Sequence, residues 1–145
     1  RHIPTTVINF VEGTRFTEEK REATRSRHRH LMPPKAAGLA FTLAAMGEQF
    51  DSLINVTIRY PDNSETPFKD FLMGRMKRIQ VRIEELPVDE ALVGDYFNDK
   101  QFKRGFQAWL NQRWQEKDEV LEGWQRAQEP AAVAARESAR ASSGN

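Results

Sequence analysis

The sequence contains no cysteine. This absence excludes disulfide bonds, thiolate metal sites and a cysteine nucleophile, and it fits a reducing compartment without proving one. Long apolar runs are missing as well. The longest mostly apolar stretch is 36–47, which is far shorter than the ~20 residues that a membrane-spanning helix needs. The sequence therefore offers no segment for crossing a bilayer.

The chain also has almost no net charge. Lys and Arg number 22 against 21 Asp and Glu, a formal charge of +1, so the overall charge argues neither for nucleic-acid binding nor for an acidic tail. The 145 residues, of which 39% are hydrophobic, suffice for about one domain with a real core. The chain opens on Arg1 without an initiator Met, and its first residues show no signal-peptide pattern. We therefore expect a piece of a longer chain that enters just before a strand.

Hydrophobic periodicity and turn residues predict three strands and three helices. The strands are expected at 5–11, 53–60 and 77–86, and the helices at 36–46, 66–74 and 99–127. The first strand reads TTVINFV and should be buried. A strand, a crossover helix and a second strand in this order usually pair in parallel. We therefore expect an α/β fold, the C-terminal half of a mainly parallel sheet with flanking helices and a long terminal helix.

The domain organisation follows from the same patterns. Residues 1–127 are expected to be the C-terminal part of one domain. Beyond them the sequence turns into Ala, Ser and Arg without periodicity, a composition that cannot bury an apolar face. Residues 128–145 are therefore expected to form a disordered tail.

The most informative segment is FVEGTR at 10–15, because it follows the first predicted strand directly. In open α/β sheets, ligands bind at the carboxyl ends of strands. Gly13 permits a sharp turn that brings backbone N–H groups close to an anion, Thr14 can donate a hydroxyl proton, and Arg15 offers a fork that matches phosphate oxygens. Glu12 would orient Arg15 or the loop amides. The alternative is an ordinary turn with an ion pair between Glu12 and Arg15.

The same segment resembles the Phe-Pro-Glu-Gly-Thr-Arg block of the lysophosphatidic acid / glycerol-phosphate acyltransferase family. Two further features are similar to that family: Lys35 and Gly38 open a helix some twenty residues on, and a strand with a Val-x-Ile pattern follows at 56–58. The sequences of these segments look closest to the bacterial inner-membrane, YihG-like branch. The resemblance covers roughly residues 5–62 well and 63–127 loosely.

The resemblance implies which residues bind substrate. Glu12, Gly13, Thr14 and Arg15 would form the block that binds the acceptor phosphate, with Arg15 as the principal ligand. Lys35 would either add a second positive charge there or lie in water at the helix start. Two positions depart from the family. Val11 stands where many members have Pro, and Asn55 stands where a later block usually has Pro, so no functional residue is carried over from that strand.

The resemblance further implies an enzyme that moves a fatty acyl group from acyl-CoA or acyl-carrier protein to the hydroxyl of a lysophospholipid such as lysophosphatidic acid, in phospholipid biosynthesis, with no cofactor and no metal. Its general base would be a His with an Asp five residues later. The residues five after His2, His28 and His30 are Val, Pro and Lys. The dyad is therefore expected before Arg1, and this piece alone is expected to be inactive. The implied location is the cytoplasmic face of the bacterial inner membrane, and the membrane surface is an expected partner.

A basic segment carries the competing interpretation. Residues 15–35 hold seven basic and three acidic residues and predict a solvated loop, or a loop with one frayed helical turn. This segment could instead dock a non-enzymatic module on anionic membrane or nucleic acid. No aromatic residue interleaves the run to stack bases, which disfavours nucleic acid. Within it, His28 and His30 are expected in water rather than on a metal, because neighbouring Arg side chains repel a cation. On the last helix, Trp114 lies off the main apolar stripe and is the tryptophan expected to touch a membrane.

Overall fold

The computed structural model describes residues 6–62 and 67–142, with side chains as far as Gln128. The chain divides into two compact units. One unit comprises Arg1–Leu53 and Glu85–Asp118, and the other comprises Ile54–Glu84 and Glu119–Asn145. The prediction of an α/β fold is confirmed, but the arrangement of its sheet differs from the expectation.

In the first unit, helix α2 (Ala36–Met46) has the bounds that the sequence predicts. It starts two residues after Pro34, since proline disfavours helix in the residue before it and is tolerated at a helix start. Gly47 ends it, and the backbone N–H of Gly47 donates to the carbonyl of Leu43. Leu39, Ala40 and Leu43 are buried, so one side of α2 contributes to the core of this unit.

The remainder of that core comes from the start of helix α4 (Lys100–Ser142) and the segment before it. Asp99 caps α4, because its carboxylate accepts from the backbone N–H groups of Gln101 and Phe102. Phe106, Leu110 and Trp114 follow at intervals of four and are buried. Two short 3-10 helices, η1 (Gly47–Gln49) and η2 (Glu90–Leu92), contact α2.

The basic segment is only partly the solvated loop that we expect. It contains a short helix, α1 (Glu18–Ala23), which is capped by Thr17 and has no buried residue. After α1 the chain turns inward, and His28, Leu31 and Met32 are buried. The prediction that His28 lies in water is therefore wrong, because its neighbours Leu31 and Met32 carry enough apolar surface to fix the loop on the core.

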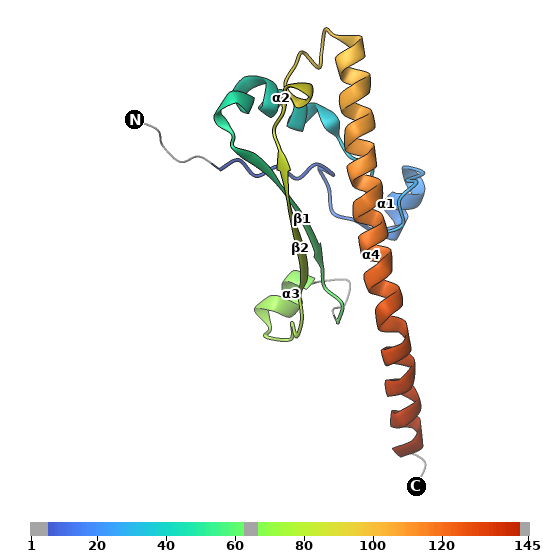
Figure 1. Cartoon of the computed structure of the whole chain (residues 1–145). Coiled ribbons are helices and arrows are strands. Elements are labelled where there is room, and N and C mark those ends of the chain that lie inside the picture. The colour runs from blue at the N-terminus through green and yellow to red at the C-terminus, as the bar shows by residue number, and fades with distance from the viewer. Residues whose placement is uncertain (1–5, 63–66, 143–145) are drawn as a thin grey trace. The chain divides into compact units, whose positions relative to one another are not determined.

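The sheet has two strands, β1 (Ser52–Arg59) and β2 (Gln80–Pro87), which lie side by side and antiparallel (Figure 1). Both strands were predicted, and so was the short helix between them, α3 (Pro67–Leu72). The mainly parallel sheet is wrong. The parallel pair that we expect joins residues 5–11 to β1 across α2, and the first of these strands does not form. β1 and β2, which do pair, run antiparallel.

The first predicted strand does not form. Residues 6–10 have no regular secondary structure and are exposed, with Phe10 at 83%; Thr5 lies outside the described residues. Strand propensity alone does not make a strand, because the backbone N–H and C=O groups need a neighbouring strand to pair with. In the part of the chain that the structure describes, β1 and β2 pair only with each other.

The two strands expose their apolar side chains, although apolar side chains that alternate along a strand are usually buried. Side chains on a strand alternate between two faces, and the apolar set is the exposed one: Ile54, Val56, Ile58, Val81 and Ile83. Thr57, on the other face, is buried. A cross-strand hydrogen bond of 3.2 Å joins Asn55 Nδ2 to Glu84 Oε2.

Helix α4 continues through Ser142, past the predicted helix end at residue 127 and into the stretch expected to be a disordered tail. Residues 143–145 of that tail lie outside the described residues. Within the part that the structure describes, no helix combines the length and the apolar character that crossing a membrane requires.

Candidate functional site: the turn at residues 10–15

The segment that resembles an acyltransferase block forms a tight turn at the start of α2. The backbone N–H of Gly13 donates to the carbonyl of Phe10 at 2.8 Å, and that of Lys35 donates to the carbonyl of Val11 at 2.8 Å. Gly13 has a φ of +64°, a left-handed conformation that favours glycine. The turn is thus fixed on both sides, and it lies next to the first residue of α2.

Glu12 supports the turn rather than Arg15. Its Oε2 accepts the backbone N–H of Met32 at 2.8 Å, and the structure places no ion pair between Glu12 and Arg15 among the described residues. The amide that Glu12 binds belongs to Met32 and not to the turn at residues 10–15. The pKa of the Glu12 carboxyl is raised above its usual value, because burial outweighs the opposite effects of the Met32 amide, Lys117 and His28.

Thr14 has a partner that its position in the sequence does not indicate. Lys20, in the first turns of α1, donates from Nζ to the Thr14 hydroxyl oxygen at 3.0 Å. A hydroxyl group that accepts one hydrogen bond keeps its own proton to donate. Thr14 can therefore still donate to an anion, and the contact brings a second cation to the turn.

Arg15 and Lys35 provide the remaining positive charge. Arg15 is exposed, and no hydrogen bond or ion pair involves its side chain among the described residues. The Lys35 side chain lies against the turn: a Cβ atom on Gly13 would come within 3.0 Å of Lys35 Nζ. Lys35 is also exposed at the start of α2, so its contribution to a phosphate site stays a prediction.

The start of α2 adds a further favourable field. Lys35 is the N-cap residue of α2, and no side chain caps the helix there. The first N–H groups of a helix without such a cap carry partial positive charge, which favours an anion. The turn therefore collects backbone N–H groups, one hydroxyl and the cations Arg15, Lys20 and Lys35, which together suit a phosphate group.

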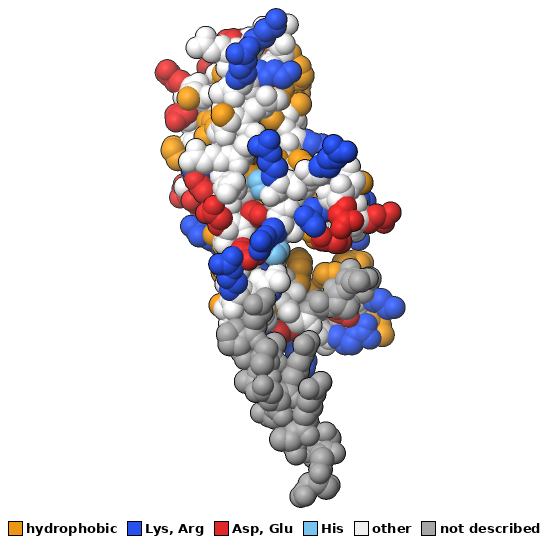
Figure 2. Space-filling model, turned by 90° about the vertical axis from the view of Figure 1, so that its right-hand side faces the viewer, with side chains coloured by type: hydrophobic (Ala, Val, Ile, Leu, Met, Phe, Trp, Pro, Cys, Tyr) orange, Lys and Arg blue, Asp and Glu red, His pale blue; other side chains and the backbone are white. Residues whose placement is uncertain are grey.

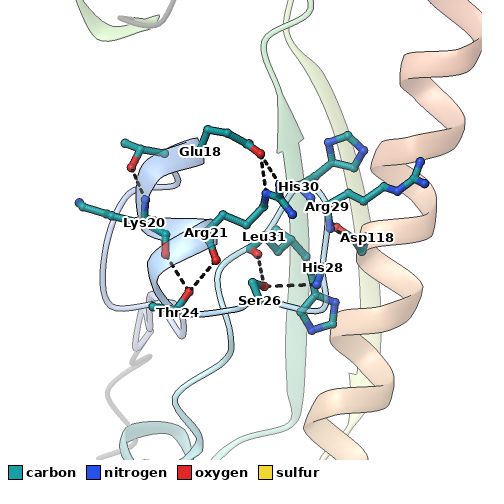
Figure 3. A network of polar contacts seen from close by, with 11 residues as sticks. Glu18, Lys20, Arg21, Thr24, Ser26, His28, Arg29, His30, Leu31 and Asp118 are labelled. Carbon is teal, nitrogen blue, oxygen red and sulfur yellow. Dashed lines mark hydrogen bonds and ion pairs between the residues drawn. The ribbon is translucent and has the colours of Figure 1, made fainter.

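Behind the turn, a network of polar contacts holds the buried part of the basic segment on α4 (Figure 3). Asp118 accepts the backbone N–H groups of His30 at 2.8 Å and Arg29 at 2.9 Å. Ser26 accepts from the backbone N–H of His28 and donates to the Leu31 carbonyl at 3.0 Å. These bonds fix the backbone immediately before Met32, the residue that binds Glu12.

Trp114 completes this support, contrary to the expectation that it touches a membrane. Its side chain is 7% exposed, and its indole N–H donates to the carbonyl of Met32 at 3.0 Å. Trp114 lies four residues after Leu110 and eight after Phe106, which are both buried. This spacing was the available signal that Trp114 belongs to the buried stripe.

The basic segment has four more basic than acidic residues, but its acidic residues all lie in α1 among the basic ones. α1 contributes Glu18, Glu19 and Glu22, and Arg21 pairs with Glu18. Figure 2 shows acidic and basic side chains lying next to one another on the face that it draws. This arrangement differs from the continuous basic surface that polyanion docking requires.

Among the described residues, neither the apolar pocket nor a metal site lies at the turn. A hollow of about 320 Å³ is lined mainly by apolar residues of α2 and of residues 93–97, and none of the residues of the turn lines it. Among the described residues, no three His, Asp or Glu side chains come together as a metal site.

Comparison with known proteins identifies distant homologues that are acyltransferases. Lysocardiolipin acyltransferase 1 of Mus musculus is 25% identical over 131 residues, which cover 83% of this chain and 33% of that protein. An uncharacterized acyltransferase of Saccharomyces cerevisiae is 31% identical over 140 residues, covering 81% and 33%. The 1-acyl-sn-glycerol-3-phosphate acyltransferase delta of Homo sapiens is 25% identical over 123 residues, covering 79% and 30%.

The chain spans about a third of the length of these relatives. No family profile matches it, and no solved structure matches it significantly. The relatives support the acyltransferase superfamily that the segment at residues 10–15 resembles.

Proposed function

We propose that this chain is the acceptor-binding part of a lysophospholipid acyltransferase and that the turn at residues 10–15 holds the acceptor phosphate. The observation that carries the proposal is that Lys20 donates to Thr14 and the Lys35 side chain lies against Gly13, in the turn that Arg15 follows directly in the sequence. The acyltransferase names of the distant homologues support the reaction class.

In this proposal Arg15 is the principal phosphate ligand. Its guanidinium group is exposed and has no protein partner among the described residues, so it can form a bidentate, charge-assisted contact with phosphate oxygens. Lys35 and the Thr14 hydroxyl would bind the remaining oxygens. Glu12 positions the turn through Met32 and does not contact the ligand, because a carboxylate would repel a phosphate.

The phosphate contact would orient the acceptor hydroxyl for the reaction. A general base takes the hydroxyl proton, the hydroxyl oxygen attacks the thioester carbonyl, and the C–S bond breaks to release the thiol, which takes up the proton. The base is proposed to be a His oriented by an Asp five residues later, upstream of Arg1. Fixing the acceptor in place lowers the entropic part of the barrier, which is the contribution that this chain makes.

The finer assignments belong to the same proposal. The acceptor is proposed to be lysophosphatidic acid, the donor acyl-CoA or acyl-carrier protein, and the branch the bacterial YihG-like one with its inner-membrane location. A free phosphate on a glycerol fits the charge of the turn, because such a group carries close to two negative charges at neutral pH.

The direct test is the binding of glycerol 3-phosphate to the 145-residue chain, followed by calorimetry or amide chemical shifts. Binding should be at least about tenfold weaker in Arg15→Ala, because a bidentate charge-assisted pair is lost. Arg104→Ala, which removes an exposed Arg of α4, is the matched control and should bind like the wild type.

The competing function, docking of a basic module on any polyanion, predicts a different pattern. It would give a steep salt dependence shared by sulfate, heparin and nucleic acid, and comparable losses in Arg15→Ala and Arg25→Ala. The proposed function requires glycerol 3-phosphate to compete better than sulfate. Equal affinity for both anions, or an unchanged Arg15→Ala, contradicts it.

A further inference from the structure

The connection between β1 and β2 carries a cluster of exposed apolar side chains that the proposed function does not use. Phe68, Phe71 and Leu72 are 64%, 61% and 67% exposed, and Met73, which follows directly, is also exposed. Spacings of three and four place the first three on one face of α3. Scattered exposed apolar residues are ordinary on a protein surface, whereas a contiguous group of this size marks an interaction site.

The charge around this cluster is of one sign. From residue 67 to residue 83 the chain has five basic residues and one acidic residue, Asp70. Asp70 is buried, and its carboxylate pairs with Arg75 at 3.1 Å. No acidic side chain of this stretch is therefore left at the surface, although Arg78 pairs with the more distant Asp62 at 2.9 Å.

Three of the five basic residues keep their charge available. The side chains of Lys69, Lys77 and Arg82 form no hydrogen bond or ion pair among the described residues, and all three residues are exposed. Lys69 lies on α3 itself, between Phe68 and Phe71, and Lys77 follows Met73 by four residues. Apolar and cationic residues are thus interleaved along one short segment. The segment includes α3, which lies at one end of the pair of strands β1 and β2 (Figure 1).

We propose that this surface, the α3 patch of Phe68, Lys69, Phe71, Leu72, Met73 and Lys77, docks the protein on an anionic phospholipid membrane. Phe, Leu and Met side chains enter the boundary between headgroups and acyl chains, while adjacent Lys and Arg side chains attract anionic headgroups. A purely apolar partner would leave the excess positive charge without a role. The patch lies apart in sequence from the turn at residues 10–15, so the inference does not depend on the phosphate site.

The absence of cysteine permits a site-specific probe of this docking. Leu72→Cys labelled with the environment-sensitive dye NBD would be the only thiol adduct, since the chain has no other Cys. On vesicles of phosphatidylcholine with about a third phosphatidylglycerol, the emission should rise about twofold or more and shift to the blue. Phe41→Cys, at a residue of α2 that is also exposed, is the matched control and should not respond.

Two sets of variants test the two components of the patch. Phe68→Ser combined with Phe71→Ser removes apolar contact, and Lys69→Glu combined with Lys77→Glu reverses the charge. Each pair should weaken vesicle binding by at least about tenfold. Phe41→Ser and Arg104→Glu make the same chemical changes elsewhere and should leave binding unchanged. Because all these side chains are exposed, folding can be verified independently by circular dichroism.

Several outcomes would overturn the proposal. These are an unresponsive NBD group at position 72, an equal response at position 41, and equal binding to neutral phosphatidylcholine vesicles. A chain that ignores vesicles but dimerises in sedimentation experiments, and no longer does so in Phe71→Ser, would show that the patch binds a second copy. The variant that combines Phe68→Ser with Phe71→Ser should bind glycerol 3-phosphate like the wild type, so failure of the phosphate site and failure of the patch can be told apart.

Discussion

At the scale of single residues, the turn shows a division of work between two charged neighbours. Glu12 is half-buried and holds the Met32 amide, whereas Arg15 is exposed and has no partner among the described residues. A sequence motif that reads as one ligand-binding unit therefore separates into a residue that shapes the turn and a residue that is free to bind. Substituting the first should affect mainly stability, and substituting the second should affect mainly affinity.

Gly13 permits a matched test of the turn. Gly13→Ala forces an L side chain into φ +64° and brings its Cβ within 3.0 Å of Lys35 Nζ. Gly74→Ala imposes similar strain at φ +65°, where nothing lies within 4 Å. Each variant should lose about 1–2 kcal/mol in the free energy of unfolding, measured by urea titration. Only Gly13→Ala should also lose affinity for glycerol 3-phosphate, because its Cβ displaces Lys35.

The comparison of the two glycines separates strain from function. A loss of affinity in Gly74→Ala as large as that in Gly13→Ala would mean that general destabilisation explains both. An unchanged affinity in Gly13→Ala would remove Lys35 from the phosphate site, since the Lys35 contact with Gly13 could not then matter for binding.

At the scale of elements, the sequence predicted those whose signals are local. The bounds of α2 are right because Pro33-Pro34 and Gly47 mark its two ends. β1, β2 and α3 were also predicted, from alternation and turn residues. Pairing is a non-local property, and there the prediction of a parallel sheet and of a strand at residues 5–11 was wrong.

The difference between local and non-local contacts also explains which residues of the site could be predicted. Arg15, Thr14 and Gly13 lie on one local turn and could be identified from their order in the sequence. Lys20 reaches Thr14 only because α1 forms between them. Asp118 and Trp114 lie more than 80 residues from the backbone groups that they bind. No pattern in a single sequence indicates such contacts, because they depend on how the loop packs on α4.

Asp118 gives the prediction that belongs to this scale. Asp118→Ala should cost about 1.5–3 kcal/mol in the free energy of unfolding, since two charge-assisted bonds to the Arg29 and His30 amides are lost. Asp118→Asn keeps one acceptor oxygen and should cost clearly less. Hydrogen exchange measured by NMR should show faster exchange of both amides in the Ala variant.

Two other results for Asp118→Ala would contradict this role. If the Arg29 and His30 amides of Asp118→Ala exchange as slowly as in the wild type, Asp118 does not hold this loop. If both amides exchange faster but glycerol 3-phosphate binds as before, the loop is not needed to place the turn, and the link from Asp118 through Met32 to Glu12 has no functional consequence.

At the scale of the whole molecule, binding and chemistry are expected to reside in different parts of the protein. The residues proposed to hold the phosphate are present in this chain, but none of its three histidines has an Asp five residues later. The relatives are about three times as long as the region that matches. The proposal therefore assigns the base to a part of the parent protein that precedes residue 1.

This assignment predicts that the 145-residue chain binds glycerol 3-phosphate but transfers no acyl group. With acyl-CoA as donor and lysophosphatidic acid as acceptor, thiol release should equal the background of buffer alone. The parent protein should catalyse the reaction, and Arg15→Ala in that protein should raise the KM for the acceptor and lower kcat, because a loosely held acceptor is misplaced relative to the base. Arg15→Lys should restore little of the activity, since an ammonium group cannot copy the bidentate contact. Turnover by the chain alone would mean that a base lies within it, and parent kinetics unchanged by Arg15→Ala would mean that the phosphate is held elsewhere.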